Sequence, residues 1–269
     1  MLRRFLALSV ASAALLLAAC QQAGTGPSSV SAPSSSASTA GASAPATGRI
    51  TVFAAASLQG SFTTLGKRFE AAHPGSAVAF DFGPSSGLAT QIVQGAPADV
   101  FASASTATMD QVAKAGLARD SAPFARNTME IAVPAANPGR VGGIADLVRP
   151  SVTVALCQPQ VPCGATALRV LGNAGLKLTP VTQEVDVKAV LSKVSLDEVD
   201  AGMVYVTDVR TAGARVKGVP IPARYNATTS YPIAAVATSA HRATAEAFVR
   251  YVLSPAGAAV LVADGFLKP

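Results

Sequence analysis

The sequence predicts an α/β fold with largely parallel sheets, because short apolar segments of strand character alternate with amphipathic helical patterns along the chain. The first unit sets the pattern. Residues 50–53 form an apolar, β-branched run, and apolar residues then recur at helical spacing from Leu58 to Phe69. Ser57 stands where this helix begins, and free N–H groups and the helix dipole favour negative charge there.

Further strand and helix patterns follow in order along the chain. Strands are expected at 77–82, 98–104, 129–134, 152–156, 181–185, 201–206, 219–221 and 231–239, and helices at 85–93, 106–115, 142–148, 164–171, 187–194, 241–253 and 254–266. Helix starts near Ser57, Ser85, Cys163 and Val187 each follow a strand or a loop that leaves one, and Tyr205 lies near a strand end. Ligands of α/β sheets bind at such ends.

The N-terminus has the pattern of an exported protein. Arg3 and Arg4 precede an apolar run that is too short to span a bilayer comfortably, which is typical of a signal peptide over residues 1–19. The ending Leu-Ala-Ala-Cys resembles the bacterial lipobox, which implies cleavage before Cys20 and lipid attachment to its sulfur. The alternative is a retained membrane anchor in which Cys20 is an ordinary apolar residue.

A flexible tether is expected over residues 20–48, because Ser, Ala, Pro, Gly and Thr dominate it and charged and aromatic residues are missing from it. The body that follows is long enough for one large or two small domains. The net charge of +6 comes from scattered residues, with no basic tract interleaved with aromatics, so nucleic acid is not an expected partner.

Two cysteines remain in the body, Cys157 and Cys163, which are close together in a segment that contains two prolines. In the oxidising compartment that a signal peptide implies, such a pair predicts a short-loop disulfide. A metal site is not expected here, because the chain has only two histidines and neither is near this pair.

Four segments together resemble the molybdate-binding proteins of ABC transporters: ITVFAAASL at 50–58, GAPADVF at 95–101, GMVY at 202–205 and YPIA at 231–234. The resemblance covers about residues 49–266. It implies a two-lobed periplasmic-binding-protein type II fold with a ligand cleft between the lobes. Residues 49–129 plus 230–269 are expected to form lobe I, and residues 130–229 lobe II.

The resemblance also implies the residues that contact molybdate. They are the hydroxyl and N–H groups of Ser57 and Ser85, the main-chain N–H groups of Cys163 and Val187, and the Tyr205 hydroxyl. The chain departs from the family at Cys163, where alanine is frequent, and at Pro84, where serine occurs. Hinge closure on the ligand, with the strands near 127–134 and 231–236 crossing between the lobes, is the expected mechanism.

Donors of this kind suit molybdate and tungstate, which are tetrahedral dianions whose oxygens only accept hydrogen bonds. Hydrogen phosphate needs an acceptor in the site, and a site without a carboxylate disfavours it. Sulfate also only accepts, so cavity size would have to exclude it. No cofactor is expected, and the resemblance implies an ABC permease and its ATPase as partners of a monomer that is lipid-anchored outside the cytoplasm.

Three other functions stay open at this point. One is a binding protein for sulfate or for a small organic solute, and another is a purely structural surface lipoprotein. A hydrolase would use Ser57, Ser85 or Cys163 as nucleophile and need a positioned base. Both histidines, His73 and His241, have the surroundings of surface helix ends, and no Gly-x-Ser-x-Gly motif surrounds either serine. The protein is therefore not expected to be an enzyme.

Overall fold

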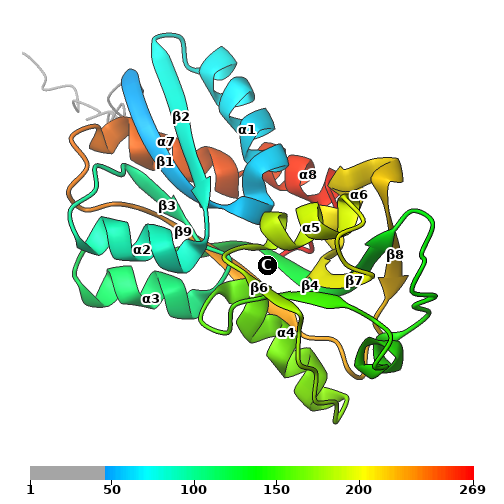
Figure 1. The fold of residues 1–269 in the computed structure, drawn as a ribbon. Coiled ribbons are helices and arrows are strands. Elements are labelled where there is room, and N and C mark those ends of the chain that lie inside the picture. The colour runs from blue at the N-terminus through cyan, green and yellow to red at the C-terminus, as the bar shows by residue number, and fades with distance from the viewer. Residues whose placement is uncertain (1–45) are drawn as a thin grey trace, which may run out of the picture. The chain divides into compact units, whose positions relative to one another are not determined.

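The computed structural model of the protein describes residues 46–269. The predicted signal peptide, the lipidation site at Cys20 and nearly all of the predicted tether lie outside the described residues. Within them, strands and helices alternate, so the α/β prediction is confirmed (Figure 1).

The elements follow one another as the hydrophobic periodicity predicted, with shifts at several ends. They are β1 (Gly48–Ala55), the 3-10 turn η1 (Ala56–Leu58), α1 (Gln59–Ala72), β2 (Ser76–Gly83), α2 (Ser85–Val93), β3 (Val100–Ala102), α3 (Thr106–Lys114), β4 (Ala122–Pro134), η2 (Ile144–Val148), β5 (Val154–Cys157), α4 (Pro162–Asn173), β6 (Thr182–Glu184), α5 (Val187–Ser195), β7 (Ala201–Tyr205), α6 (Val206–Ala212), η3 (Gly213–Arg215), β8 (Val216–Pro220), β9 (Thr228–Ala235), α7 (Arg242–Leu253) and α8 (Pro255–Ala263). Of these, α6, η3 and the first half of β4 were not predicted.

The strands pair in the order β2-β1-β3-β9-β4-β7-β5-β6, with β8 on β4. The prediction of largely parallel sheets is wrong for every pairing that β4 or β9 makes. These two strands run antiparallel to β3, β7, β8 and each other. The parallel pairs are β1 with β2 and β3, and β5 with β6 and β7, where helices make the crossovers.

β4 belongs to both halves of this sheet. Its first part, through Thr128, pairs with β9, and from Met129 onward it pairs with β7. Asn226 binds β4 at the residue where the strand changes its pairing partner. Its side chain accepts from the Met129 N–H at 3.1 Å and donates to the Met129 carbonyl at 2.8 Å. One continuous strand therefore connects two differently paired regions.

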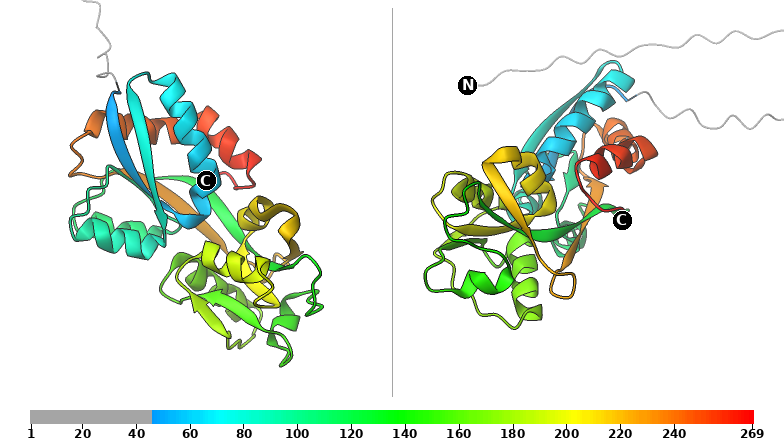
Figure 2. Two further views of the ribbon diagram at one scale, coloured as in Figure 1. Left: turned by 45° about the horizontal axis from the view of Figure 1, so that its top comes forward. Right: turned by 90° about the vertical axis from the view of Figure 1, so that its right-hand side faces the viewer.

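Three hydrophobic clusters fill the interior. Two of them cover opposite faces of the β1, β3 and β9 strands: one contains Phe62, Phe69 and Phe248 of α1 and α7, and the other contains Leu88 and Met109 of α2 and α3. The views in Figures 1 and 2 show these helix pairs on either side of the strands. The third cluster takes its residues only from the stretch between Met129 and Ile221.

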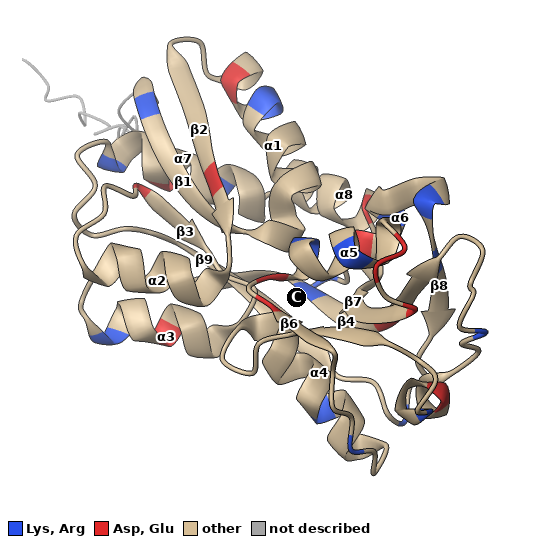
Figure 3. Cartoon of the chain, in the orientation of Figure 1, with Lys and Arg blue, Asp and Glu red and all other residues tan. Residues whose placement is uncertain are grey.

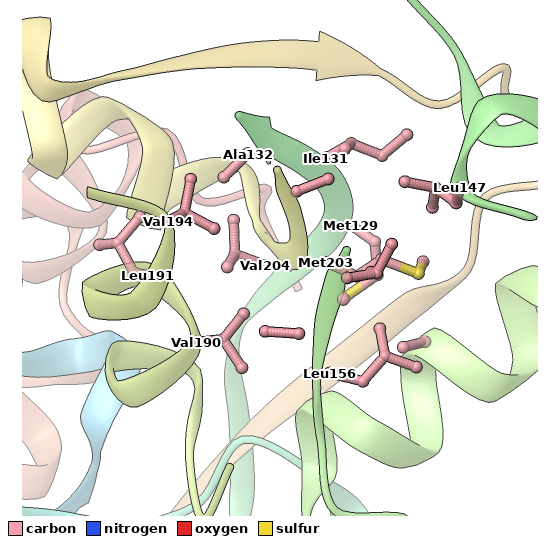
Figure 4. Close-up of a cluster of buried hydrophobic side chains, with 14 of the residues drawn as sticks. Met129, Ile131, Ala132, Leu147, Leu156, Val190, Leu191, Val194, Met203 and Val204 are labelled. Atoms are coloured by element: carbon pink, nitrogen blue, oxygen red, sulfur yellow. The ribbon is translucent and has the colours of Figure 1, made fainter. Parts of the chain in front are cut away.

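The third cluster brings α5 directly onto β7. A side chain at Gly202 would place its Cβ 2.6 Å from Val190 Cγ1 and 2.9 Å from Val194 Cγ2, so glycine permits this close approach. Figure 4 shows Val190, Leu191 and Val194 of α5 in this cluster with Val204 of β7. The first residue of α5 is thereby fixed relative to the end of β7.

Among residues 46–269, no single helix is long and apolar enough to cross a membrane. Helices α7 and α8 meet the length and composition criteria only as a pair, with a bend of 59° between them.

Candidate functional site

A small cavity lies where strand ends and helix starts converge. Its volume is about 20 Å³. Such a space exceeds what one ordered water needs, and it is far below the pocket of an organic ligand. The lining residues are Ala55, Ala56, Ser57, Gly83, Pro84, Ser85, Ala104, Val161, Pro162, Cys163, Asp186, Val187 and Tyr205.

The five residues predicted to contact ligand therefore lie around one cavity, and all five are buried. Ser57 and Ser85 belong to η1 and α2, and apolar residues of these elements pack in the first two hydrophobic clusters. Cys163, Val187 and Tyr205 belong to the third cluster. The start of α5 and η1 contact each other beside the cavity, so the two groups of residues face each other at short range.

Helix starts supply unpaired N–H groups at this cavity. The first helical bond of α2 runs from the Leu88 N–H to the Pro84 carbonyl, so the Ser85 N–H precedes the bonded part of the helix. In α4 the first such bond is Ala165 to Val161, which leaves the Cys163 N–H free of it. These N–H groups, with the helix dipoles behind them, favour an anion.

The start of α5 is built in the same way. Asp186 caps the helix, with its Oδ1 accepting from the Ala189 N–H at 2.9 Å. The Val190 N–H makes the first main-chain bond, to the Asp186 carbonyl at 3.3 Å. Val187, the first residue of the helix, lines the cavity, and its N–H has no partner of either kind within the part of the chain that the structure describes.

The hydroxyl of each of the two cavity serines has one defined hydrogen-bond partner within the protein. The Ser85 Oγ accepts from the Ala104 N–H at 3.0 Å. The Ser57 Oγ lies 3.0 Å from the hydroxyl of Tyr231, a fully buried residue of β9. When each serine accepts from the group behind it, its single hydroxyl proton is available to donate into the cavity.

Tyr205 contributes a hydroxyl that has no hydrogen-bond partner among the described residues, although the side chain is only 1% exposed. Burial raises the pKa of Tyr205 and the nearby Asp208 raises it further, whereas Thr166 and Tyr231, which lie near its hydroxyl beyond good hydrogen-bond geometry, lower it. The hydroxyl therefore stays protonated and is a donor at any ordinary pH. An unpartnered buried donor at a cavity wall fits an acceptor-only ligand, which would satisfy it.

An ion pair fixes Tyr205 relative to the start of α5. The Lys188 ammonium lies 2.9 Å from Asp208 Oδ1, and Asp208 Oδ2 accepts from the Tyr205 N–H at 3.2 Å. Asp208 is fully buried; burial raises its pKa, whereas Lys188 lowers it. The pair joins the two segments that carry Val187 and Tyr205.

The charges around the cavity differ from the prediction in one respect. Its lining contains no lysine or arginine, and Figure 3 shows basic and acidic residues interspersed over the elements. The expectation that no carboxylate belongs to the site is wrong, because Asp186 lines the cavity. Its position follows from its capping role, since the residue before a donor at a helix start must also lie close to the ligand.

Cys157 at the end of β5 and Cys163 in the first turn of α4 form a disulfide. The pairing agrees with the prediction from their spacing. The chain between them returns against the first turn of α4, where the Val161 N–H bonds the Gln158 carbonyl at 3.1 Å. The disulfide therefore anchors Cys163, a residue of the cavity lining.

Three larger cavities, of about 390, 380 and 200 Å³, lie elsewhere and share few or no residues with this one. Arginines and acidic residues line the cavity of about 390 Å³, beside the start of α7. No group of three or more His, Cys, Asp or Glu residues in the range 46–269 has the geometry of a metal site. The helix starts around Ser57 thus remain the candidate binding site.

A family model described as bacterial extracellular solute-binding protein matches residues 50–267. The chain is 47% identical over 221 residues to Molybdate-binding protein ModA of Mycobacterium tuberculosis, which covers 82% of this chain and 85% of that protein. The periplasmic molybdate-binding protein of Azotobacter vinelandii superposes with a TM-score of 0.72 at 25% identity, over 82% of this chain and 99% of that one.

The sulfate-binding protein SubI of Mycobacterium tuberculosis superposes with a TM-score of 0.71 at 20% identity, over 82% of this chain and 86% of that one. This likeness shows the fold alone. With these neighbours, the prediction of a two-lobed periplasmic-binding-protein type II fold with a ligand cleft is confirmed. The chain belongs to the family of bacterial extracellular solute-binding proteins, within the group that contains the molybdate-binding proteins of ABC transporters.

Proposed function

We propose that this protein is the extracytoplasmic component of an ABC importer that captures molybdate, and tungstate with it, and delivers the ion to a permease. The observation that carries the proposal is the Tyr205 hydroxyl, a buried donor that has no partner within residues 46–269 and belongs to a residue of a cavity lined by other uncharged donors. The names of two relatives, which are molybdate-binding proteins, support the same ligand.

The donors have the chemistry that a tetrahedral dianion needs. Ser57, Ser85 and Tyr205 offer hydroxyl protons, and the starts of η1, α2, α4 and α5 offer main-chain N–H groups. Each hydrogen bond to a charged group contributes about 1.5–3 kcal/mol. Several such bonds in a site shielded from water can hold a dianion without a lysine or arginine.

Calorimetric titration of the body, residues 46–269, with molybdate, tungstate, sulfate and phosphate tests the proposal. We expect tight binding of molybdate and tungstate, and binding of sulfate and phosphate weaker by at least about a hundredfold. Tight sulfate binding without molybdate binding would overturn it. Phosphate is an informative comparison because Asp186 brings a carboxylate to the wall, and an Asp186→Asn variant shows whether that group influences phosphate binding.

The two sides of the cavity are proposed to move as lobes, formed by residues 49–129 plus 230–269 and by residues 130–229. Three features support this division. The third cluster draws only on the stretch between Met129 and Ile221. Strand β4 changes partner at Met129, and β9 begins at Thr228. The connecting strands are then the natural place for a hinge.

A ligand that bonds donors from both lobes favours the closed arrangement. We therefore expect small-angle X-ray scattering to show a smaller radius of gyration in saturating molybdate than in ligand-free buffer. Sulfate at the same ionic strength is the control for a salt effect. An unchanged scattering curve with molybdate, at concentrations where calorimetry shows binding, would contradict hinge closure but not the binding function.

The remaining features of the proposal concern location and partners. We infer a monomer, held at the membrane by a lipid on Cys20, that docks on an ABC permease with its ATPase. Catalysis is no part of it: Cys163 has no free thiol, and neither His73 nor His241 lines the cavity. His73 instead stacks on Phe69 at the end of α1, and its Nδ1 lies 3.0 Å from the Phe69 carbonyl oxygen.

A further inference from the structure

Tyr231 contacts Ser57, a residue of the cavity lining, without lining the cavity itself. It is fully buried, it does not line the cavity, and its hydroxyl oxygen is 3.0 Å from the Ser57 Oγ. The ring is held by edge-to-face contacts with Phe266, Phe124 and Tyr205, at centroid distances of 5.3, 6.2 and 6.1 Å. Its main chain pairs with Ala125 of β4. The hydroxyl therefore has a fixed position relative to Ser57.

The direction of the Ser57–Tyr231 hydrogen bond follows from the ligand. An oxyanion without a proton can only accept, so Ser57 must donate its one proton to it. That proton is then unavailable to Tyr231, and the bond between the two side chains forms only if Tyr231 donates. Burial raises the pKa of Tyr231 well above its ordinary value, so this proton is present.

We propose that Tyr231 is a positioning residue for the oxyanion, which donates to the Ser57 Oγ and thereby directs the Ser57 proton toward the ligand. The inference rests on the proposed function. Hydroxyls in such a chain polarise one another, so that Ser57 becomes a better donor than an isolated serine.

Ser85 provides an internal comparison. The group behind its hydroxyl is the main-chain N–H of Ala104, which can only donate. Each cavity serine thus accepts a hydrogen bond from a buried donor. This donor is a main-chain N–H for Ser85 and a side-chain hydroxyl for Ser57. Only the Tyr231 donor can be removed by a conservative substitution, Tyr231→Phe, which keeps the ring and its packing.

A double-mutant cycle tests whether Tyr231 acts through Ser57. Molybdate affinity is measured calorimetrically for the unsubstituted protein, Tyr231→Phe, Ser57→Ala and the double variant. We expect Tyr231→Phe to lose about threefold to tenfold in affinity. In the Ser57→Ala background the same change should cost nothing, because the hydroxyl it acts through is gone. A merely structural role would give the same fold-loss in both backgrounds and would overturn the inference.

Two controls sharpen the cycle. Combining Tyr231→Phe with Ser85→Ala should multiply the two losses, since Ser85 takes its hydrogen bond from Ala104. Tyr251→Phe, which changes a half-buried tyrosine beside Phe69 and away from the cavity, should leave the affinity unchanged. Thermal unfolding of each variant without ligand checks that the fold is retained.

A measurement on the unsubstituted protein does not depend on the variants folding. By NMR, the Tyr231 hydroxyl proton should exchange with water more slowly once molybdate is bound, because the ligand fixes the whole chain of donors. Unchanged exchange would contradict the proposal. If the unsubstituted protein does not bind molybdate, the proposed function fails; if it binds and the cycle shows no coupling, only the role of Tyr231 fails.

Discussion

Tyr205→Phe is expected to weaken molybdate binding by about tenfold to a hundredfold while leaving the ligand-free protein as stable as before, or more stable. The two effects have a common cause. The Tyr205 hydroxyl is buried and has no partner among the described residues. In the free protein it has lost its water without gaining a hydrogen bond, a cost of about 1–3 kcal/mol for such a group.

Phenylalanine removes this cost and retains the ring, which packs against Tyr231 at 6.1 Å between centroids. In the complex, however, phenylalanine cannot donate to the dianion. Calorimetry gives the affinity, and urea unfolding without ligand gives the stability. Tyr225→Phe is the matched control, because that half-buried tyrosine does not line the cavity and should change neither quantity. Equal losses of affinity and stability would show that the hydroxyl has a structural role instead.

Gly164→Ala is expected to lower the free energy of unfolding by about 3 kcal/mol, at the upper end of overpacking effects. A Cβ at Gly164 would lie 1.9 Å from the Gln158 carbonyl oxygen and 2.8 Å from the Cys157 oxygen. Both atoms are main chain. The Cys157–Cys163 disulfide and the bond from the Gln158 N–H to the Glu184 carbonyl hold that segment, so it cannot move away freely.

Relief of this clash must displace the first turn of α4, which carries the Cys163 N–H. We therefore expect molybdate affinity to fall by at least about tenfold, as for loss of a hydrogen bond to a charged group. Gly172→Ala in the same helix is the matched control. A Cβ there meets nothing within 4 Å, and alanine should stabilise the helix by about 0.5–1 kcal/mol. Denaturant unfolding and calorimetry of both variants would decide; a Gly164→Ala protein that matches Gly172→Ala would refute the prediction.

The sequence predicted the parts of this site that have local signals. Ser57, Ser85, Cys163 and Val187 each stand at a helix start after a strand or loop, and the family motifs named the same positions together with Tyr205. The capping residue Asp186 also had a local signal, because an aspartate directly before a helical pattern is an N-cap. Such a cap also brings a carboxyl group to the start of the helix.

Contacts between distant segments left no such signal. The bond between Ser57 and Tyr231 joins residues 174 positions apart. The first half of β4 lacks a clear alternation, and its partner β9 comes about a hundred residues later, so only the assembled sheet defines it as a strand. The antiparallel pairings of β4 and β9 escaped prediction for the same reason, since alternation of elements gives strand content but not strand direction.

The helix starts have a consequence for mutational scanning. An alanine scan of the cavity removes the hydroxyls of Ser57, Ser85 and Tyr205, but it leaves every main-chain N–H in place. Proline is the natural residue that deletes such a donor, and the first position of a helix tolerates it, as Pro162 of α4 shows. Val187 occupies that position in α5, after Asp186 in an extended conformation that a following proline accepts. A scan that also substitutes proline at the first positions of the helices would therefore test main-chain N–H donors that alanine substitution leaves in place.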